Sequence, residues 1–512
     1  MIGMEEAITQ NTNGFQKPEA LKLSFRRLME PLLVLFNKAA SRVLADRPFY
    51  IAYSIPGGVY GYFQDYLAGN KELQAIEKAI HQMIFNKEKI MHDLLTNSDL
   101  LAYFDKYGRE DMIQLIRSKT PQVELDGFPL AHLNGYGEFF PNYLSEDYDR
   151  LKNFQLRPFG KGFFLIADPL FFNRVMPAKA IQSKYFQGFE ESEETMKYLG
   201  VASFAELNHI IREGRLPEFI KLSEAWQARR ISQIADSILG HNNKSRVVFL
   251  AGPTSSGKTT SAKRLAIELK VLKQKVIMLS LDNYYLPHRK IPDDPQTGIK
   301  NFELITALDL ELFRQNINDL LAGKPVHLPK YHFDGHGAIP EKQATVIDSN
   351  TYLIVEGIHG LNPDLWRDVM DVDSFRLYVS ALSTLNIHDH LPLSTSDHRL
   401  MRRMIRDQLF RGYDYKETIS RWPDIIQNEY KSIFPYQESA HAIFNSALVY
   451  EPAVFAHYAP EILKNNESNN ALISEEAKRI KRLLSLLIPI NPIDIPPTSI
   501  LREFIGGSSF NY

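Results

Sequence analysis

The chain has 512 residues, of which 44% are hydrophobic and 23% are charged, and its formal net charge is −2. This length predicts two or three domains, and the near-neutral charge gives no overall attraction to nucleic acid or to an anionic membrane. The chain contains no cysteine, which excludes disulfides, thiolate zinc sites and cysteine nucleophiles.

The first stretch, residues 1–19, is polar and rich in Asn and Gln, which predicts disorder. It has no apolar segment of the kind found in signal peptides, and no run of the chain reaches eighteen apolar residues. We therefore expect a cytoplasmic protein with no membrane partner.

Residues 20–185 show mixed helical and strand patterns and predict a compact α+β module. Helical spacing of apolar residues occurs over 21–44, 71–85 and 110–118. The aromatic stretch 49–63 is interrupted by Pro56-Gly57-Gly58, which is typical of a hairpin, and further short strands are expected over 127–164. The many aromatic residues, among them Tyr53 and Tyr60, favour a hydrophobic core over a base-stacking surface.

Residues 186–244 are predicted to form a helical linker, with a long helix over 217–239. The polar break at 240–245 then marks the domain boundary most clearly indicated by the sequence.

A phosphate-binding loop follows this boundary. The apolar run Val247–Ala251 predicts a buried strand, then comes the pattern G-x-x-x-x-G-K-T, and then a helical pattern. Glycines let the backbone N–H groups approach an anion, the lysine reaches the β- and γ-phosphates, and the threonine hydroxyl can bind Mg²⁺. The residues expected to bind ATP are Gly252, Pro253, Thr254, Ser255, Ser256, Gly257, Lys258, Thr259 and Thr260.

Four more apolar runs, at 275–281, 351–355, 375–380 and 447–450, are the other expected strands. Their alternation with helical segments predicts an α/β fold with a doubly wound parallel sheet over 245–470, followed by a C-terminal helix and tail over 471–512. Ligands of such sheets bind beyond the carboxyl ends of the strands.

Two acidic residues end predicted strands and are therefore expected beside Lys258. Asp282 is the candidate base for an acceptor hydroxyl, and Glu356 is the candidate metal anchor, with Thr259 and Asp282 as further metal ligands. A solvated acid or a helix cap is the alternative for either residue alone.

Arginines recur every three or four residues in the predicted helix Arg399–Arg411, so that Arg399, Arg402 or Arg403, and Arg406 share one face. Such a pattern is often a solvated basic face. After the fourth strand of a kinase-like sheet it favours a closing lid that brings positive charge to the phosphates.

The segments LAGPTSSGKTT, LSLDNYY, KNFE, LPKYHFDGH, LIVEGIHGLN and LMRRMIRDQLFRG resemble the uridine kinase/phosphoribulokinase family of P-loop kinases. The segments ADPLFFNRVMP, IFPYQESAHAIFNSALVYE and IPPTSILREFIGGS extend the resemblance to bacterial members that carry a threonyl-tRNA-synthetase-like additional domain in front of the kinase. The resemblance covers about residues 45–507 and is strongest over 245–451.

The resemblance implies a role for individual residues. It makes Asp282 the catalytic aspartate, Glu303 the counterpart of an aspartate that holds the ribose hydroxyls, and Tyr331 and His336 the residues that contact the base. It implies that the catalytic residues are Lys258, Asp282 and the lid arginines Arg403, Arg406 and Arg411, and that the acceptor contacts Asp282, Tyr285, Glu303, Tyr331, His336 and Arg403.

The sequence also departs from the family. Arg411-Gly412-Tyr413 stands where uridine kinases have Arg-Gly-Arg, and a base-contacting glutamine is replaced near Arg421. In the front module, His81, His92 and His132 lack the spacing of the synthetase editing site, so editing activity and zinc are not expected.

These observations favour an ATP- and Mg²⁺-dependent kinase that phosphorylates a hydroxyl of a nucleoside such as uridine or cytidine, or of a related compound. The alternative is a nucleotide-gated protein that binds tRNA or other RNA through the front module and uses the kinase half as a switch. A degenerate kinase scaffold is disfavoured because no catalytic position is lost. Homo-oligomerisation would fit the family.

Overall fold

A computed structural model describes residues 24–44, 47–119, 127–142, 144, 150–167, 184–241, 246–293, 300–332, 337–369, 373–464 and 468–512, without the side chains of 24–27 and 185. The chain divides into two compact units, 1–107 with 124–173, and 108–123 with 174–512. The predicted disorder of residues 1–19 lies outside the described residues. The domain boundaries drawn from the sequence stay predictions.

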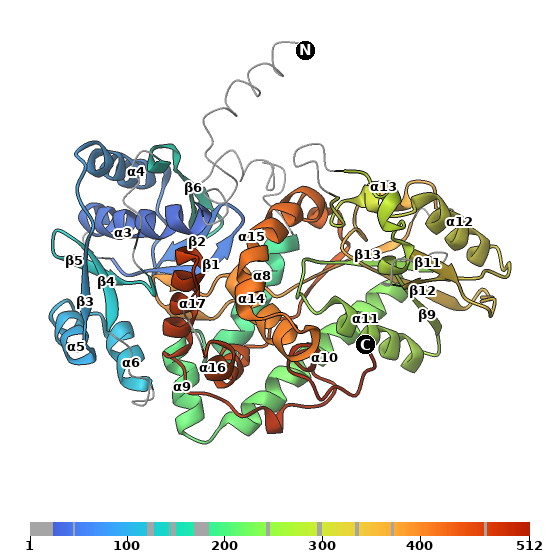
Figure 1. The fold of residues 1–512 in the computed structure, drawn as a ribbon. Coiled ribbons are helices and arrows are strands. Elements are labelled where there is room, and N and C mark those ends of the chain that lie inside the picture. The colour runs from blue at the N-terminus through green and yellow to red at the C-terminus, as the bar shows by residue number, and fades with distance from the viewer. Residues whose placement is uncertain are drawn as a thin grey trace, which may run out of the picture. The chain divides into compact units, whose positions relative to one another are not determined.

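The first unit has two antiparallel sheets, as the α+β pattern predicted (Figure 1). One has the order β1-β2-β7-β6 (Phe49–Ile55, Gly58–Phe63, Gly162–Ile166, Gln155–Phe159), and the other has the order β3-β4-β5 (Met91–Leu95, Phe128–Leu133, Tyr136–Phe139). Its helices are α3 (Ser24–Leu44), α4 (Asn70–Phe85) and α5 (Asn97–Lys106). Likeness to a synthetase domain stays a prediction.

Aromatic side chains fill the core of this unit. Phe36 contacts Phe163 with ring centroids 4.9 Å apart. Tyr53 and Tyr60 are both buried and stack with ring centroids 5.0 Å apart. Burial of these rings confirms that they belong to a core, and it leaves them unable to stack on nucleic-acid bases.

The second unit contains a five-stranded parallel sheet with the order β16-β13-β8-β12-β9. The strands are β8 (Val247–Ala251), β9 (Lys275–Ser280), β12 (Thr351–Glu356), β13 (Phe375–Ser380) and β16 (Ala442–Asn445). The strand before the phosphate loop, β8, is central and wholly buried, which is why its sequence is a continuous apolar run. The predicted doubly wound parallel sheet is thus confirmed.

Helices of the second unit surround this sheet and continue beyond it (Figure 1). They are α6 (Glu110–Ser118), α8 (Lys184–Leu199), α9 (Phe204–Arg212), α10 (Leu216–Gly240), α11 (Lys258–Val271), α12 (Leu310–Leu321), α13 (Pro363–Trp366), α14 (Thr395–Arg406), α15 (Tyr415–Ser432), α16 (Glu451–Ile462), α17 (Ala471–Leu484) and α18 (Arg502–Ile505). Two short hairpins, β10-β11 (Pro329–His332, Gly337–Pro340) and β14-β15 (Asn386–His388, Leu391–Pro392), complete it. Within the described ranges, no helix is both long and apolar enough to cross a membrane.

The expected fifth strand was placed wrongly. The strand is β16, Ala442–Asn445, whereas residues 447–450 form the turn that leads into α16. The Asn445 side chain ends the strand, because its Oδ1 accepts hydrogen bonds from Leu382 N and Ala447 N, both at 2.9 Å. The apolar residues after it lead into a helix, and an apolar run alone does not distinguish such a segment from a strand.

Candidate functional site

The phosphate loop, residues 252–260, runs from the end of β8 into the first turn of α11, and its backbone requires glycine at two positions. A Cβ built on Gly252 would lie 2.0 Å from the carbonyl oxygen of Val379, and Gly257 has φ +79°. Ser255, which is not a glycine, also has a positive φ of 57°. A strained backbone of this kind turns N–H groups toward one side, where an anion can bind.

Lys258 opens α11 and lies among acidic side chains. Its Nζ donates to the carbonyl oxygen of Pro253 at 3.2 Å. Desolvation lowers the pKa of Lys258, while the carboxylates of Glu356 and Asp282 counteract this shift. The structure thus brings together the lysine and the two carboxylates that the sequence placed at the ends of neighbouring strands.

Two arginines of α14 donate hydrogen bonds to carbonyl oxygens of the loop. Both are buried, with 2% of Arg399 and 0% of Arg402 exposed. Arg399 donates to both carboxylate oxygens of Glu429 at 2.7 and 2.8 Å and to the carbonyl oxygen of Thr254 at 3.0 Å. The amide of Thr254 in turn donates to Glu429 at 2.8 Å. A solvated basic face is therefore ruled out for these two arginines.

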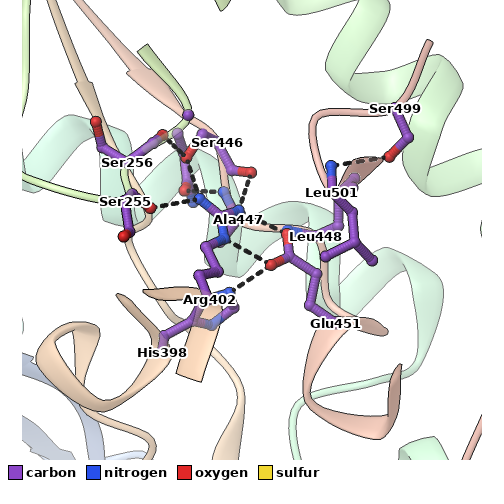
Figure 2. Close-up of polar contacts among 12 residues, drawn as sticks. Ser255, Ser256, His398, Arg402, Ser446, Ala447, Leu448, Glu451, Ser499 and Leu501 are labelled. Atoms are coloured by element: carbon purple, nitrogen blue, oxygen red, sulfur yellow. Dashed lines mark hydrogen bonds and ion pairs between the residues drawn. The ribbon is translucent and has the colours of Figure 1, made fainter. Parts of the chain in front are cut away.

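Arg402 makes the second of these supports (Figure 2). It donates to both oxygens of Glu451 at 2.6 and 2.7 Å, and to the carbonyl oxygen of Ser255 at 3.2 Å. Ser446 continues the network, because its hydroxyl accepts from Arg402 at 3.0 Å and donates to the carbonyl oxygen of Ser256 at 2.5 Å. Two successive loop carbonyls are thus fixed by one buried arginine and its serine neighbour.

The next two arginines on α14 contact loop hydroxyls instead. Arg403 donates to Thr254 Oγ1 at 3.0 Å, and Arg406 donates to Ser255 Oγ at 3.3 Å. Arg406 Nε is buried without a hydrogen-bond partner among the described residues. The predicted shared face of the helix is confirmed, and Arg403 and Arg406 reach the loop through its hydroxyl groups, not through its carbonyl groups.

The carboxylates at the strand ends resist ionisation. Desolvation of the carboxylate raises the pKa of Asp282, although part of the residue stays exposed and Lys258 and Arg411 act in the opposite direction. Burial and the charge of Asp282 raise the pKa of Glu356 to about 7, against the influence of Lys258. Neighbouring acids with perturbed pKa values are typical of functional sites.

The residues expected to contact an acceptor gather next to Asp282. Burial and the charge of Glu429 raise the pKa of Glu303, while Arg403 and Lys258 lower it. Tyr285 lies with its ring centroid 6.0 Å from that of Tyr331 and 6.0 Å from that of Phe302. His336, the other residue expected at a base, lies outside the described residues.

A π-helical turn, Asp407–Arg411, follows α14 and carries the third predicted lid arginine. The Arg411 side chain is 47% exposed and lies 3.4 Å from Asp407, and its charge reaches Asp282. Gly412 then takes a positive φ of 70°. Near the departure from the family pattern, the Arg421 guanidinium lies 4.6 Å from the ring centroid of Tyr413.

Sequence reasoning missed the carboxylates that hold the arginines, Glu429 and Glu451, and a third, Glu503, which binds Thr260. The sequence held one indication of these carboxylates. Glu429 lies on the apolar face of α15, four residues after the buried Ile425, where a hydrophobic residue is expected. A charge at such a position predicts a buried ionic partner.

Comparison with known proteins finds a family match within the second unit. The sequence pattern of the phosphoribulokinase/uridine kinase family matches residues 247–449. The C-terminal half of the chain contains a P-loop kinase domain of this family.

The similar proteins are distant. Uridine kinase of Saccharomyces cerevisiae is 29% identical over 277 residues, which cover 52% of this chain and 51% of that protein. Uridine kinase of Staphylococcus epidermidis (strain RP62A) is 28% identical over 185 residues, covering 36% of this chain and 79% of that protein. The chain thus spans about half the length of the Saccharomyces cerevisiae protein and 79% of the Staphylococcus epidermidis protein.

Among solved structures, the D-glycerate 3-kinase of Cryptococcus neoformans var. grubii is 17% identical, with a TM-score of 0.23 over 50% of this chain and 88% of that chain. A likeness at this level carries no inference about the acceptor.

Proposed function

We propose that the protein transfers the γ-phosphoryl group of ATP to a hydroxyl of a nucleoside or a closely related compound. The observation that carries the proposal is the convergence of Lys258, Arg403 and Arg406 on one face of the phosphate loop, with Asp282 beside them. Phosphoryl transfer needs a phosphate cradle, positive charge and a group that orients the acceptor hydroxyl.

On the donor side, the N–H groups of residues 252–260 would hold the phosphates, and Lys258 would bind the β- and γ-oxygens. Arg403 and Arg406 would then exchange their loop hydroxyl partners for phosphoryl oxygens. Cations held in a desolvated site stabilise developing charge more strongly than they would in water.

On the acceptor side, Asp282 would accept the proton of the attacking hydroxyl. Its raised pKa brings it nearer to neutral pH, where a base is most effective. Glu303 would accept hydrogen bonds from ribose hydroxyls, and the neighbouring rings of Tyr285, Phe302 and Tyr331 would offer flat surfaces for a base. A nucleoside satisfies all three features together.

The donor set also fits Mg²⁺. Thr259 and Glu356, with Asp282 nearby, would hold the ion, which supplies charge neutralisation at the bridging phosphate oxygens. The described residues contain no group of three or more acidic or histidine side chains able to form a closed metal cage. This suits an ion bound by one or two protein oxygens and completed by phosphates and water.

Arg411 would complete the charge over the transferring group once the 407–411 turn closes. The turn is π-helical and is followed by a glycine with positive φ, and both features are common where a helix changes direction at a functional site. Closure would exclude water and so limit ATP hydrolysis.

The test is ATP consumption with product mass, measured against a panel of nucleosides and small polyols. We expect one panel member to gain a phosphoryl group, and Asp282→Asn to lose at least about a hundredfold in kcat while ATP binding persists. Asp236→Asn, at an exposed position of α10, is the matched control and should behave as the wild type.

If Asp282→Asn and Asp236→Asn both keep wild-type activity, the proposed role of Asp282 is contradicted. If ATP binds and no panel member is phosphorylated, the RNA-binding alternative gains support, and salt-dependent tRNA binding becomes the next assay. Partner RNA at the first unit, homo-oligomerisation and a cytoplasmic location stay predictions.

A further inference from the structure

A segment beyond the matched family range lies against the phosphate loop. Residues 499–512, which include α18, follow the helix α17 and return to the start of α11. A Cβ built on Gly257 would lie 2.7 Å from Ile500 Cγ2. The family pattern ends at residue 449, so this contact is a feature of the chain outside the matched kinase domain.

Glu503 makes the most informative contact of this segment. Its Oε2 accepts from the Thr260 hydroxyl at 2.6 Å and from the Thr260 backbone N–H at 3.3 Å. That N–H belongs to the first turn of α11, where backbone donors lack helical acceptors and bind anions. A carboxylate therefore holds one of the donors that a bound phosphate group would use.

The same carboxylate faces a cation of the site. Glu503 Oε1 lies 3.8 Å from Arg406 Nη1, and 10% of the Glu503 side chain is exposed. The neighbouring Phe504 ring centroid lies 4.8 Å from the guanidinium of Arg402 and 5.7 Å from that of Arg406. Arg406 is thus held between the loop and residues of the C-terminal segment.

The end of the segment adds two further contacts with the same elements. The Tyr512 hydroxyl lies 2.7 Å from Thr260 Oγ1, and the Lys263 ammonium lies 4.2 Å from the centroid of the Tyr512 ring. Gly506 packs against the Phe410 ring in the turn that carries Arg411. The segment therefore touches α11, α14 and the 407–411 turn, all of which surround the loop.

We propose that Glu503 sets the affinity of the phosphate loop for nucleotide by occupying a phosphate position in the nucleotide-free protein. A phosphate that approaches Thr260 N meets a carboxylate of the same charge sign, so the carboxylate has to leave before the phosphate can bind. Arg406 then exchanges a carboxylate neighbour for phosphoryl oxygens, and residues 499–512 loosen. This inference rests on the proposed function, because it requires that the loop bind ATP.

The first test is calorimetric titration with ATP in the absence of any acceptor. Glu503→Gln keeps the size of the side chain and removes its charge, and we expect it to bind ATP on the order of tenfold more tightly than the wild type. Glu461→Gln, at an exposed position of α16, should bind ATP as the wild type does.

Unchanged or weaker binding by Glu503→Gln would overturn the inference alone, since the wild type still binds ATP. Absence of ATP binding by the wild type would overturn the proposed function as well.

A second measurement needs no variant. Hydrogen exchange of peptides from residues 499–512 should become faster when the wild type is saturated with ATP, because the contacts with Thr260 are given up. Slower or unchanged exchange would show that the segment clamps the nucleotide or ignores it, and either result overturns the inference.

Discussion

Two pairs of arginines on α14 differ in what holds them, and the difference separates structure from chemistry within one helix. Arg399 and Arg402 each face a buried glutamate and donate to carbonyl oxygens of the phosphate loop. Arg403 and Arg406 contact loop hydroxyls, and their acidic neighbours are also shared with other cations.

Buried arginines that donate two hydrogen bonds to a buried glutamate fix a geometry, because breaking such a pair leaves a charge without a partner. Arginines that contact the loop through hydroxyls and share an acidic neighbour with other cations remain available to a ligand. We infer that the first pair builds the loop and the second pair acts on what the loop binds.

The largest effect is expected on stability. Arg402→Met leaves Glu451 buried without its main partner and should lower the free energy of unfolding by about 3–5 kcal/mol. The tryptophans, Trp226, Trp366 and Trp422, all lie in the second unit, so fluorescence during denaturant unfolding reports on that unit. Arg229→Met, at an exposed position of α10, is the control and should stay within about 0.5 kcal/mol of the wild type.

The opposite pattern is expected for the second pair. Arg406→Met should lower kcat by about 10²–10³, the usual effect of removing one donor to transition-state charge, with a stability loss of at most about 1 kcal/mol. Steady-state kinetics on the acceptor found by the panel would measure it. A stability loss as large as that of Arg402→Met would remove the distinction between the pairs.

The pH dependence of the free energy of unfolding tests the pairing of Arg402 with Glu451. Burial alone would raise its pKa, but Arg402 and His398 outweigh burial and hold the pKa at about 2, below the ordinary 4.5. A depressed pKa stabilises the fold above the unfolded value, so this contribution of about 3 kcal/mol should be lost as the pH falls from about 4.5 to about 2.

Fluorescence-detected unfolding over this pH range should therefore show a shallower pH dependence for Glu451→Gln than for the wild type. Glu461→Gln should retain the wild-type slope. Equal slopes for all three proteins would contradict the pairing.

The smallest effect is expected at Arg411. Its side chain is half exposed, so Arg411→Ala should leave the free energy of unfolding within about 0.5 kcal/mol of the wild type. Loss of an exposed cation is worth up to about 1 kcal/mol, which corresponds to about a fivefold lower kcat. A loss as large as that of Arg406→Met would mean that closure of the 407–411 turn desolvates Arg411 as fully as Arg406.

Local patterns in the sequence were sufficient to predict the central strand of the parallel sheet and the loop that follows it. The strand β8 and the loop after it follow from a continuous apolar run and a glycine pattern, and both determine their structure within a few residues. Parallel strands then bring Asp282 and Glu356 to one edge, so the sequence also predicted that these carboxylates meet Lys258.

Partners distant in the chain could not be predicted in this way. Glu429 and Glu451 lie 30 and 49 residues after the arginines they bind, and Glu503 lies 243 residues after Thr260. Only the folded chain brings them together. The apolar run 447–450 failed for a related reason, because the Asn445 side chain ends the strand through contacts with a neighbouring strand end.

The most direct test of the account is ATP binding to the wild type and to Lys258→Met, measured by calorimetric titration. Lys258 is desolvated and has a lowered pKa, so its replacement should not reduce stability, but it should weaken ATP binding by at least about tenfold. Equal ATP affinities, or no binding by either protein, would contradict the claim that residues 252–260 hold the phosphates of a nucleotide.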